Sequence, residues 1–542
     1  MRKSVALLLA AAMTASLVTG AGCGSKTDEA SQPTTTAGGS GESSFVYTGE
    51  APITDQEGQH VSILAQNSNY TTVDIKAAPI VQKVYQDAGI TLDWTLVDPT
   101  NYKDAVSPML AAGTDLPDIV LLPDKDENMT YINSGIFVAL DEYFDYMPNY
   151  KKWLDENPAT KASLTAPDGH IYYVPGINVP YNYQPTLMYN MKWMREAGFT
   201  EAPSTLDDFT EMLRYFQSND MNGNGDAGDE IPLSIQKSFI TYMFGPAFGL
   251  NFNDSALNSF FADEDGQAHY AYYEKEKYKN FLTYMNSLYE EGLLELEYTT
   301  LTRDQIIERF AQDKTGVTFD YGYQMSMTYS PQLPYYDGTA ENGVCGVPPL
   351  SGPEKGFYVA RNGMGNIFGV NKNAKDLLLA IKFLDYTVNE ENQEMYVWGI
   401  EGESFEVDAN GKKQFTEKGK DSNWLQSFGI NPSFVYPARQ SVEATDVLVA
   451  DWHAAVDKTF EQYMDDPWPF IYATPEESSV ISQYMVDIQT YVEEMMVSFI
   501  SGVTPLDQFD NYINTLQSMN IDEILKIKTE QYQRYQNALN AK

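Results

Sequence analysis

The chain has 542 residues and a formal net charge of −41. Its length allows two or more lobes, each with its own hydrophobic core. The acidic balance, without any run of basic residues, excludes nucleic acid and anionic membrane surfaces as expected partners, because both carry negative charge.

The N-terminus has the pattern of a signal peptide over residues 1–22. Arg2 and Lys3 form a short basic region, and the mostly apolar residues 5–17 that follow are too few to span a membrane. The small residues 19–22 before Cys23 resemble the lipobox of bacterial lipoproteins, which implies cleavage before Cys23 and its lipidation. The alternative is an ordinary secretory signal followed by a chance cysteine.

Residues 23–45 are rich in Ser, Thr and Gly and have almost no apolar side chains. Such a segment cannot bury a core, so we expect a flexible linker between a lipid anchor and the folded domain.

The first folded segment alternates strands and helices. The pattern predicts strands at 60–66, 90–96 and 119–122, with helices near 79–88 and 102–112 between them. This order is typical of a mostly parallel sheet, and ligands of such sheets bind beyond the carboxyl ends of the strands. Asn67, Asn69 and Tyr70 follow the first strand and are therefore candidate ligand contacts.

Residues 168–217 contain a turn, two extended runs and an amphipathic helix. Asp168 and Gly169 form a turn pair, and extended runs are predicted at 171–174 and 185–189. A helix is predicted over 204–217, with Ser204 or Thr205 as its cap. Its apolar face is formed by Leu206, Phe209, Leu213 and Phe216.

This segment resembles the crossing between lobes in extracellular solute-binding proteins of bacterial ABC-type sugar importers. The matching positions are Asp168, Gly169, Tyr172, Pro175, Tyr189, Trp193, Gly198, Pro203, Thr205, Asp207, Asp208 and Phe209. The runs at 113–119, 135–143 and 399–405 are also similar to motifs of this family. The resemblance implies an α/β fold of two lobes, the type II or maltose-binding-protein-like arrangement, joined by hinge crossings.

The remaining elements are divided between the two expected lobes. Helices are predicted at 273–291, 303–311 and 375–389, a strand at 316–320 and a strand pair at 357–370. We assign residues 58–175 and 356–395 to lobe one and residues 176–355 and 396–542 to lobe two, with the third crossing near 395–405.

Aromatic and polar side chains near strand ends or crossings are the further candidate ligand contacts, because rings stack on sugars and polar groups bind hydroxyls. They are Tyr181, Tyr183, Tyr242, Phe244, Tyr321, Tyr323, Arg361, Trp398, Trp424, Tyr436 and Arg439. For each residue taken alone, a place in the core or on the surface is expected more often than a ligand contact, so we expect only about four of the fourteen candidates to touch ligand.

Residues 220–230 form a candidate calcium loop. Ca²⁺ prefers six to eight oxygen ligands, and acidic or amide side chains at alternate positions of a Gly-rich turn provide them. The candidate ligands are Asp220, Asn222, Asn224, Asp226, Asp229 and Glu230. The twelfth position is Ile231 where an EF-hand has Glu, so this is not a standard EF-hand. The loop resembles the shorter D-x-N-x-N-G … D-E loop of some members of the same family, which implies a structural calcium ion. The alternative is a solvated Asn-Gly turn.

Catalytic motifs are absent from the sequence, and the four histidines show no metal-ligand spacing. The resemblance implies a monomeric, non-enzymatic lipoprotein at the outer face of the cell membrane, which captures an oligosaccharide and delivers it to ABC permease subunits. Alternatives are a binding protein for a peptide or another polar solute, a surface-anchored polysaccharide hydrolase, and an adhesion or sensor lipoprotein.

Overall fold

The computed structural model describes residues 45–67, 74–123, 128–178, 185–253, 255–360 and 363–541. The predicted signal peptide, Cys23 and all but the last residue of the predicted linker lie outside these ranges. The buried hydrophobic side chains form two large cores, one around each of two main sheets. Within the described ranges, no helix combines the length and the apolar character needed to cross a membrane.

The first sheet has five strands. Their order is β2 (Ile90–Val97), β1 (Gln59–Gln66), β3 (Ile119–Leu121), β12 (Met364–Val370) and β4 (Tyr173–Ile177). Strand β1 pairs in parallel with β2 and β3, whereas β12 is antiparallel to both β3 and β4. The sheet is therefore mostly parallel, as predicted, with β12 as the one reversed strand.

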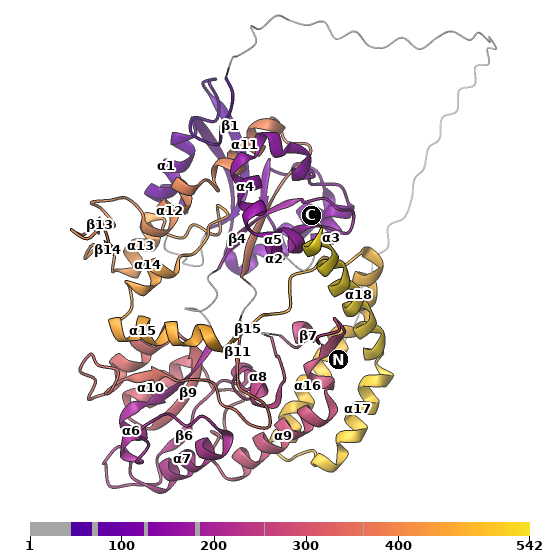
Figure 1. Ribbon diagram of the computed structural model, residues 1–542. Helices are drawn as coiled ribbons and strands as arrows, with labels where there is room; N and C mark the ends of the chain where they lie inside the picture. Colours follow the sequence, from indigo (N-terminus) through magenta and orange to yellow (C-terminus); the bar gives the residue numbers. More distant parts are fainter. Residues whose placement is uncertain are drawn as a thin grey trace, which may run out of the picture. The chain divides into compact units, whose positions relative to one another are not determined.

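Helices cover this sheet, as Figure 1 shows for α1, α4 and α11. Those that contribute to the first core are α1 (Pro79–Asp87), α2 (Tyr102–Ala112), α3 (Asn128–Asn133), α4 (Pro148–Glu156), α5 (Pro158–Leu164), α11 (Leu377–Tyr386), α12 (Glu390–Trp398) and α13 (Ser422–Phe428). Helix α1 begins at Pro79, where the missing N–H of proline costs nothing, and buries Ile80, Val81 and Val84.

The first described residues are fixed to this core through Asp385 of α11. The hydroxyl of Tyr47 and the Nδ2 amide of Asn149 both donate to Asp385 Oδ2, at 2.8 and 2.9 Å. The backbone N–H of Tyr150 donates to Oδ1 at 2.8 Å. Asp385 has no exposed surface, and this burial raises its pKa from 3.8 to about 7, although the three hydrogen bonds oppose the shift.

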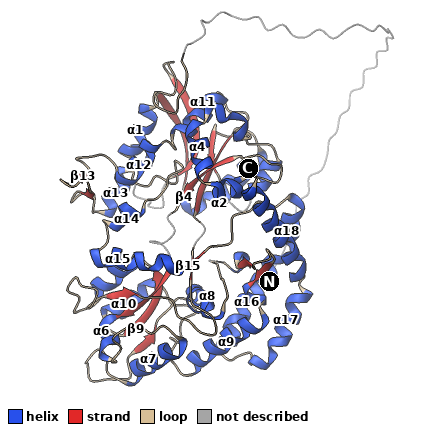
Figure 2. Cartoon of the chain, in the orientation of Figure 1, coloured by secondary structure: helices blue, strands red, loops and turns tan. Residues whose placement is uncertain are grey.

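The second sheet has four strands. Their order is β10 (Val344–Gly346), β5 (Pro185–Asn190), β9 (Thr315–Tyr321) and β6 (Ile231–Leu233). Strand β5 is antiparallel to β10 and β9, and β6 is parallel to β9. Figure 2 shows helices around these strands. The second core includes side chains of α6 (Met191–Glu196), α7 (Leu206–Ser218), α8 (Lys237–Phe244), α9 (Lys275–Glu290), α10 (Arg303–Ala311) and α15 (Asp451–Phe460).

Helix α7 shows how the sequence determines one of these contacts. Thr205 caps it, since its hydroxyl accepts the N–H of Asp208 at 3.2 Å. The four apolar residues of its predicted face are all buried. Phe216 packs edge-on against Trp193, with ring centroids 5.4 Å apart, and both rings lie over Gly316 of β9. A Cβ at Gly316 would come within 2.5 Å of the Phe216 ring, so this position has room for glycine only.

Three C-terminal helices complete the second core, namely α16 (Pro475–Ile500), α17 (Phe509–Ser518) and α18 (Ile521–Asn540). Smaller pairs of strands lie outside the two main sheets. They are β7 (Phe260–Ala262) with β8 (Ala268–Tyr270), β13 (Phe405–Val407) with β14 (Lys413–Phe415), and β11 (Tyr358–Val359) with β15 (Met464–Asp465). Helix α14 (Val442–Asp446) joins a small third cluster with Trp398.

Core membership differs from the predicted division between lobes. Residues up to Ala438 still contribute to the first core, and Trp452 and Val456 are the next to pack against the second, followed by the buried Phe460. Tyr436 explains the difference, since its ring stacks on Tyr396 at 5.7 Å and its hydroxyl donates to Val81 O at 3.0 Å. Side chains of the first core thus give way to side chains of the second between Ala438 and Trp452, and Phe470 and Tyr472 belong again to the first core. The bounds of the two lobes stay a prediction.

Candidate ligand pocket and calcium loop

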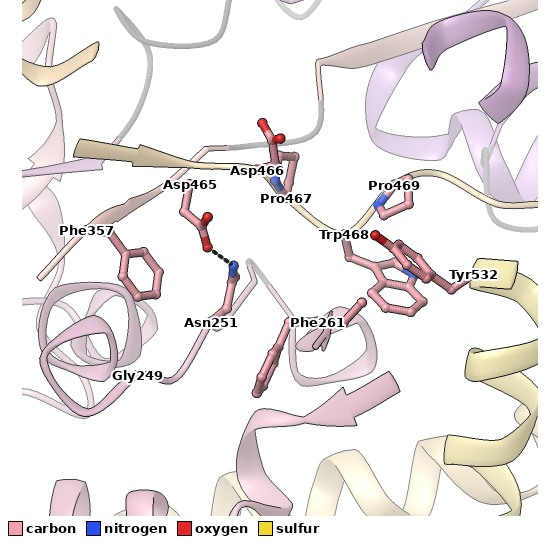
Figure 3. A pocket seen from close by; sticks show the side chains of 11 residues that line it. Gly249, Asn251, Phe261, Phe357, Asp465, Asp466, Pro467, Trp468, Pro469 and Tyr532 are labelled. Atoms are coloured by element: carbon pink, nitrogen blue, oxygen red, sulfur yellow. Dashed lines mark hydrogen bonds between the residues drawn. The ribbon is translucent and has the colours of Figure 1, made fainter. Parts of the chain in front are cut away.

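One pocket is formed by chain segments that are far apart in the sequence. It has a volume of ≈ 290 Å³. Its lining residues come from the loop after α8, from β7, from the segment before β11, from the end of β15 with the residues that follow it, and from α18. They are Gly249, Asn251, Phe261, Ala262, Phe357, Asp465, Asp466, Pro467, Trp468, Pro469 and Tyr532 (Figure 3).

Aromatic rings form one side of this pocket. The rings of Trp468 and Tyr532 lie 5.2 Å apart at an interplanar angle of 31°, and Phe260 lies 6.1 Å behind Trp468. Trp468 stands between Pro467 and Pro469, whose rings restrict the backbone, and it is only partly buried. The pocket therefore offers an indole and a phenol that are already packed together before any ligand binds.

Polar groups lie at the other end. Asn251 is buried, and its Nδ2 donates to Asp465 Oδ2 at 3.1 Å. Partial burial raises the pKa of Asp465, while the hydrogen bond from Asn251 lowers it. Figure 3 shows Asp465 directed toward Asn251 and Asp466 directed to the other side of the segment. Aromatic faces beside an amide and a carboxylate suit a ligand with both apolar ring faces and hydroxyl groups.

A second aromatic group lies at the carboxyl end of β9. The predicted contacts Tyr321 and Tyr323 stack with centroids 6.1 Å apart, and Phe239 lies edge-on to Tyr321 at 5.5 Å. The guanidinium of Arg303 lies 5.7 Å from the Tyr321 ring and binds both oxygens of Asp320, at 2.6 and 2.7 Å. The structure thus brings two of the predicted residues together.

The other predicted contacts are scattered. Tyr242, Phe244, Trp398 and Tyr436 are buried in the hydrophobic clusters. Trp424 stacks on Phe428 at 4.6 Å, the Arg439 guanidinium lies 4.4 Å from the Trp153 ring, and the Asn67 N–H donates to Val97 O at 2.9 Å. Asn69, Tyr70, Tyr181, Tyr183 and Arg361 lie outside the described residues.

None of the predicted contacts that the structure describes lines the pocket. The residues that do, above all Asn251, Asp465, Trp468 and Tyr532, were missed. One signal was present in the sequence, because Asp465-Asp466-Pro467-Trp468-Pro469 holds a tryptophan between two prolines, where neither a helix nor a central strand would bury it.

The candidate calcium loop is held by its own side chains. Asp220 accepts the N–H of Gly223 at Oδ1 and that of Gly225 at Oδ2, both at 2.7 Å. Asn224 Nδ2 donates to Asp229 Oδ2 at 3.0 Å, and Lys314 Nζ lies 3.1 Å from the same oxygen. The loop is therefore folded around its acidic and amide groups.

Glu230 is the loop residue whose hydrogen bonding is incomplete. Its Oε1 accepts the N–H of Met221 at 2.9 Å, whereas its buried Oε2 has no partner, and burial raises its pKa. No three His, Cys, Asp or Glu side chains converge as metal ligands anywhere in the described ranges. Oxygen donors alone, both carboxylate and amide, match the preference of Ca²⁺, so the residue types of the loop fit this ion.

Comparisons with known proteins agree with one another. The profile of the bacterial extracellular solute-binding protein family matches residues 71–394. The fructooligosaccharide ABC transporter substrate-binding protein FusA of Streptococcus pneumoniae serotype 4 is 27% identical over 564 residues, covering 97% of each chain.

Two solved structures share the fold. One is a FusA EF-hand mutant in complex with fructo-nystose, with a TM-score of 0.70, 23% identity, and coverage of 88% of this chain and 100% of that one. The other is the alginate-binding protein AlgQ2 without calcium ion, with a TM-score of 0.69, 20% identity, and coverage of 89% and 100%.

Proposed function

Because this chain belongs to the bacterial extracellular solute-binding protein family, we propose that it captures an oligosaccharide and delivers it to the permease of an ABC importer. The observation that carries the proposal is the pocket, where Trp468 and Tyr532 offer ring faces and the Asn251–Asp465 pair offers hydrogen bonds. The relative FusA, named for fructooligosaccharides and aligned along nearly the whole chain, supports the same ligand class.

Capture needs no covalent chemistry from this chain. Sugar rings would stack on Trp468 and Tyr532, and their hydroxyl groups would bind Asn251 and Asp465. The two cores would act as lobes that close around the ligand through the passages between them, and the closed form would be the one that the permease recognises. The Tyr321–Tyr323 pair is the second place where a longer oligosaccharide would make contact.

The protein would work as a monomer on the outer face of the cell membrane. The basic and apolar N-terminus supports export, and Cys23 is the residue that would carry the lipid. The Ser-, Thr- and Gly-rich residues that follow would act as the linker between this anchor and the folded domain.

Calcium would be a structural ion in the loop 220–230. Asp220, Asn222, Asn224 and Asp226 would supply oxygens from alternate positions, and Glu230 would add the carboxylate oxygen that now lacks a partner. The bound ion would neutralise several carboxylates at once and brace the second lobe. Asp229, which is bound to Asn224 and Lys314, would hold the loop in shape.

Thermal unfolding of the full chain, purified in mild detergent, tests these proposals. Mono- and oligosaccharides are compared with peptides, each with calcium and with a chelator. A ligand at 100 times its dissociation constant adds about 2.7 kcal/mol to stability, which raises the midpoint measurably. A rise with one class of glycan supports the proposal. A rise with peptides alone, or with no ligand, refutes it.

A further inference from the structure

The pocket has an acidic side chain directed into it and no basic one among its described lining residues. Asp465 and Asp466 both line it, and Asp465 is directed toward Asn251 (Figure 3). Two ammonium groups lie near the lining residues: that of Lys277 donates to the carbonyl oxygen of Gly249 at 3.4 Å, and that of Lys528 lies 5.1 Å from the Phe260 ring, which packs against Trp468. A ligand in this pocket therefore meets negative charge that is only partly balanced.

The hydrogen-bonding groups of the pocket also favour a neutral ligand over an anionic one. Asp465 Oδ2 already accepts the amide of Asn251, and Oδ1 is a second acceptor of the same carboxylate. A sugar hydroxyl can donate to this carboxylate, which gives a short and strong charge-assisted hydrogen bond. The carboxylate of a uronic acid has only acceptors, so it would face Asp465 with like charge and without a proton to share.

The surroundings of Asp465 support this discrimination, although Asp465 and Asp466 are themselves exposed. Asn251 is 6% exposed, which fixes the position of the group that orients Asp465. Trp468 and Tyr532 cover the opposite side, and charges beside apolar walls are screened less than charges in water. Asp466 is directed away from Asn251 and would act only through its more distant charge.

We propose that this pocket selects neutral glycans over uronate-containing ones, with Asp465 as the residue that determines the selectivity. The inference rests on the proposed function, because it specifies which carbohydrates the pocket takes. It separates two ligand chemistries that share the same rings and linkages and differ only in a hydroxymethyl or carboxylate group at C6.

Matched pairs of ligands test the inference. Isothermal titration calorimetry on the full chain in mild detergent compares tetrasaccharides of glucose, galactose and mannose with their uronates, in which each C6 hydroxymethyl group is a carboxylate. Asp465→Asn and Asp466→Asn remove one charge each, and Asp145→Asn removes an exposed charge away from the pocket as the matched control.

We expect the best neutral tetrasaccharide to bind at least about 10-fold more tightly than its uronate at low salt. Added salt should narrow the ratio, because it screens the repulsion. Asp465→Asn should narrow it most, Asp466→Asn less, and Asp145→Asn not at all. The salt series on the unsubstituted protein gives a test that does not depend on the folding of any variant.

Three outcomes overturn the inference. First, a uronate that binds as tightly as its neutral partner shows that the pocket does not select against the carboxylate. Second, if the ratio of the two affinities changes neither with salt nor in Asp465→Asn, then Asp465 does not determine the selectivity. In both cases the proposed function survives. Absence of binding by every tetrasaccharide of both kinds, together with no rise in the thermal midpoint for any glycan, refutes the proposed function, and the inference with it.

Discussion

Asp385 should make the stability of the first lobe depend on pH in a direction opposite to that of most carboxylates. Its pKa is about 7 in the folded protein and 3.8 when exposed, so the folded state holds the proton more tightly. Between these values the folded chain binds more protons than the unfolded chain, and stability falls as pH rises. The stability that protonated Asp385 contributes is fully present below pH 4 and is lost as pH rises through 7.

The magnitude follows from the shift. Each pKa unit corresponds to 1.36 kcal/mol, so a rise from 3.8 to about 7 corresponds to roughly 4 kcal/mol. Asp385→Asn cannot titrate, and it also disturbs the hydrogen bonds from Tyr47 and Asn149 by an amount that is the same at every pH. The difference in unfolding free energy between the two proteins should therefore shrink by roughly 4 kcal/mol between pH 4 and pH 8.

Urea denaturation followed by tryptophan fluorescence at intervals from pH 4 to pH 8 measures this difference. Other carboxylates titrate equally in both proteins, so the subtraction isolates Asp385. Asp145→Asn, which removes a carboxylate at an exposed position, is the matched control and is measured over the same pH range. A flat difference for Asp385→Asn as well would show that the buried carboxylate is ionised throughout, and would refute the reasoning.

Three further expectations concern the pocket, the loop and the second core. Trp468→Ala should weaken binding of a neutral oligosaccharide by about 10-fold in calorimetry while Trp468→Phe, which keeps a ring, loses less; equal losses would exclude stacking as the cause. Chelation of calcium should lower the thermal midpoint of the unsubstituted protein and leave that of Asp220→Ala unchanged. If neither midpoint changes with calcium, the loop 220–230 is a turn without a bound ion. Gly316→Ala should reduce the free energy of unfolding by about 1–3 kcal/mol in urea titrations, because the new methyl group meets the rings of Phe216 and Trp193; no loss would mean that these rings can move aside.

Local patterns predicted the elements that position the site. The helix over 204–217 was predictable because its cap and its apolar spacing depend only on residues that are close together in the sequence. The structure confirms Thr205 as the cap. The first three strands of the parallel part of the sheet were predictable for the same reason. The point at which the chain passes from one core to the other was not predictable. The apolar pattern around Tyr436 is the same whether its ring packs in the first core or in the second.

The pocket was beyond the reach of local patterns. Asn251, Asp465 and Tyr532 are separated by long stretches of sequence, and only the folded chain brings them together. Tyr242 and Phe244 were predicted as contacts from their place in the order of elements, but both rings face the core of the second lobe. Position in the sequence does not distinguish a ring that faces a core from one that faces a pocket, since aromatic residues can lie on either side of a helix near a strand end.

The separation of these segments has a consequence for how the pocket is held together. Tyr532 lies on α18, and the pocket has both of its stacked rings only while that helix is docked. Loosening of α18 alone would therefore take one ring out of the pocket and leave the strands of both sheets paired. A substitution far from the lining residues would then weaken binding if it released this helix from the second core.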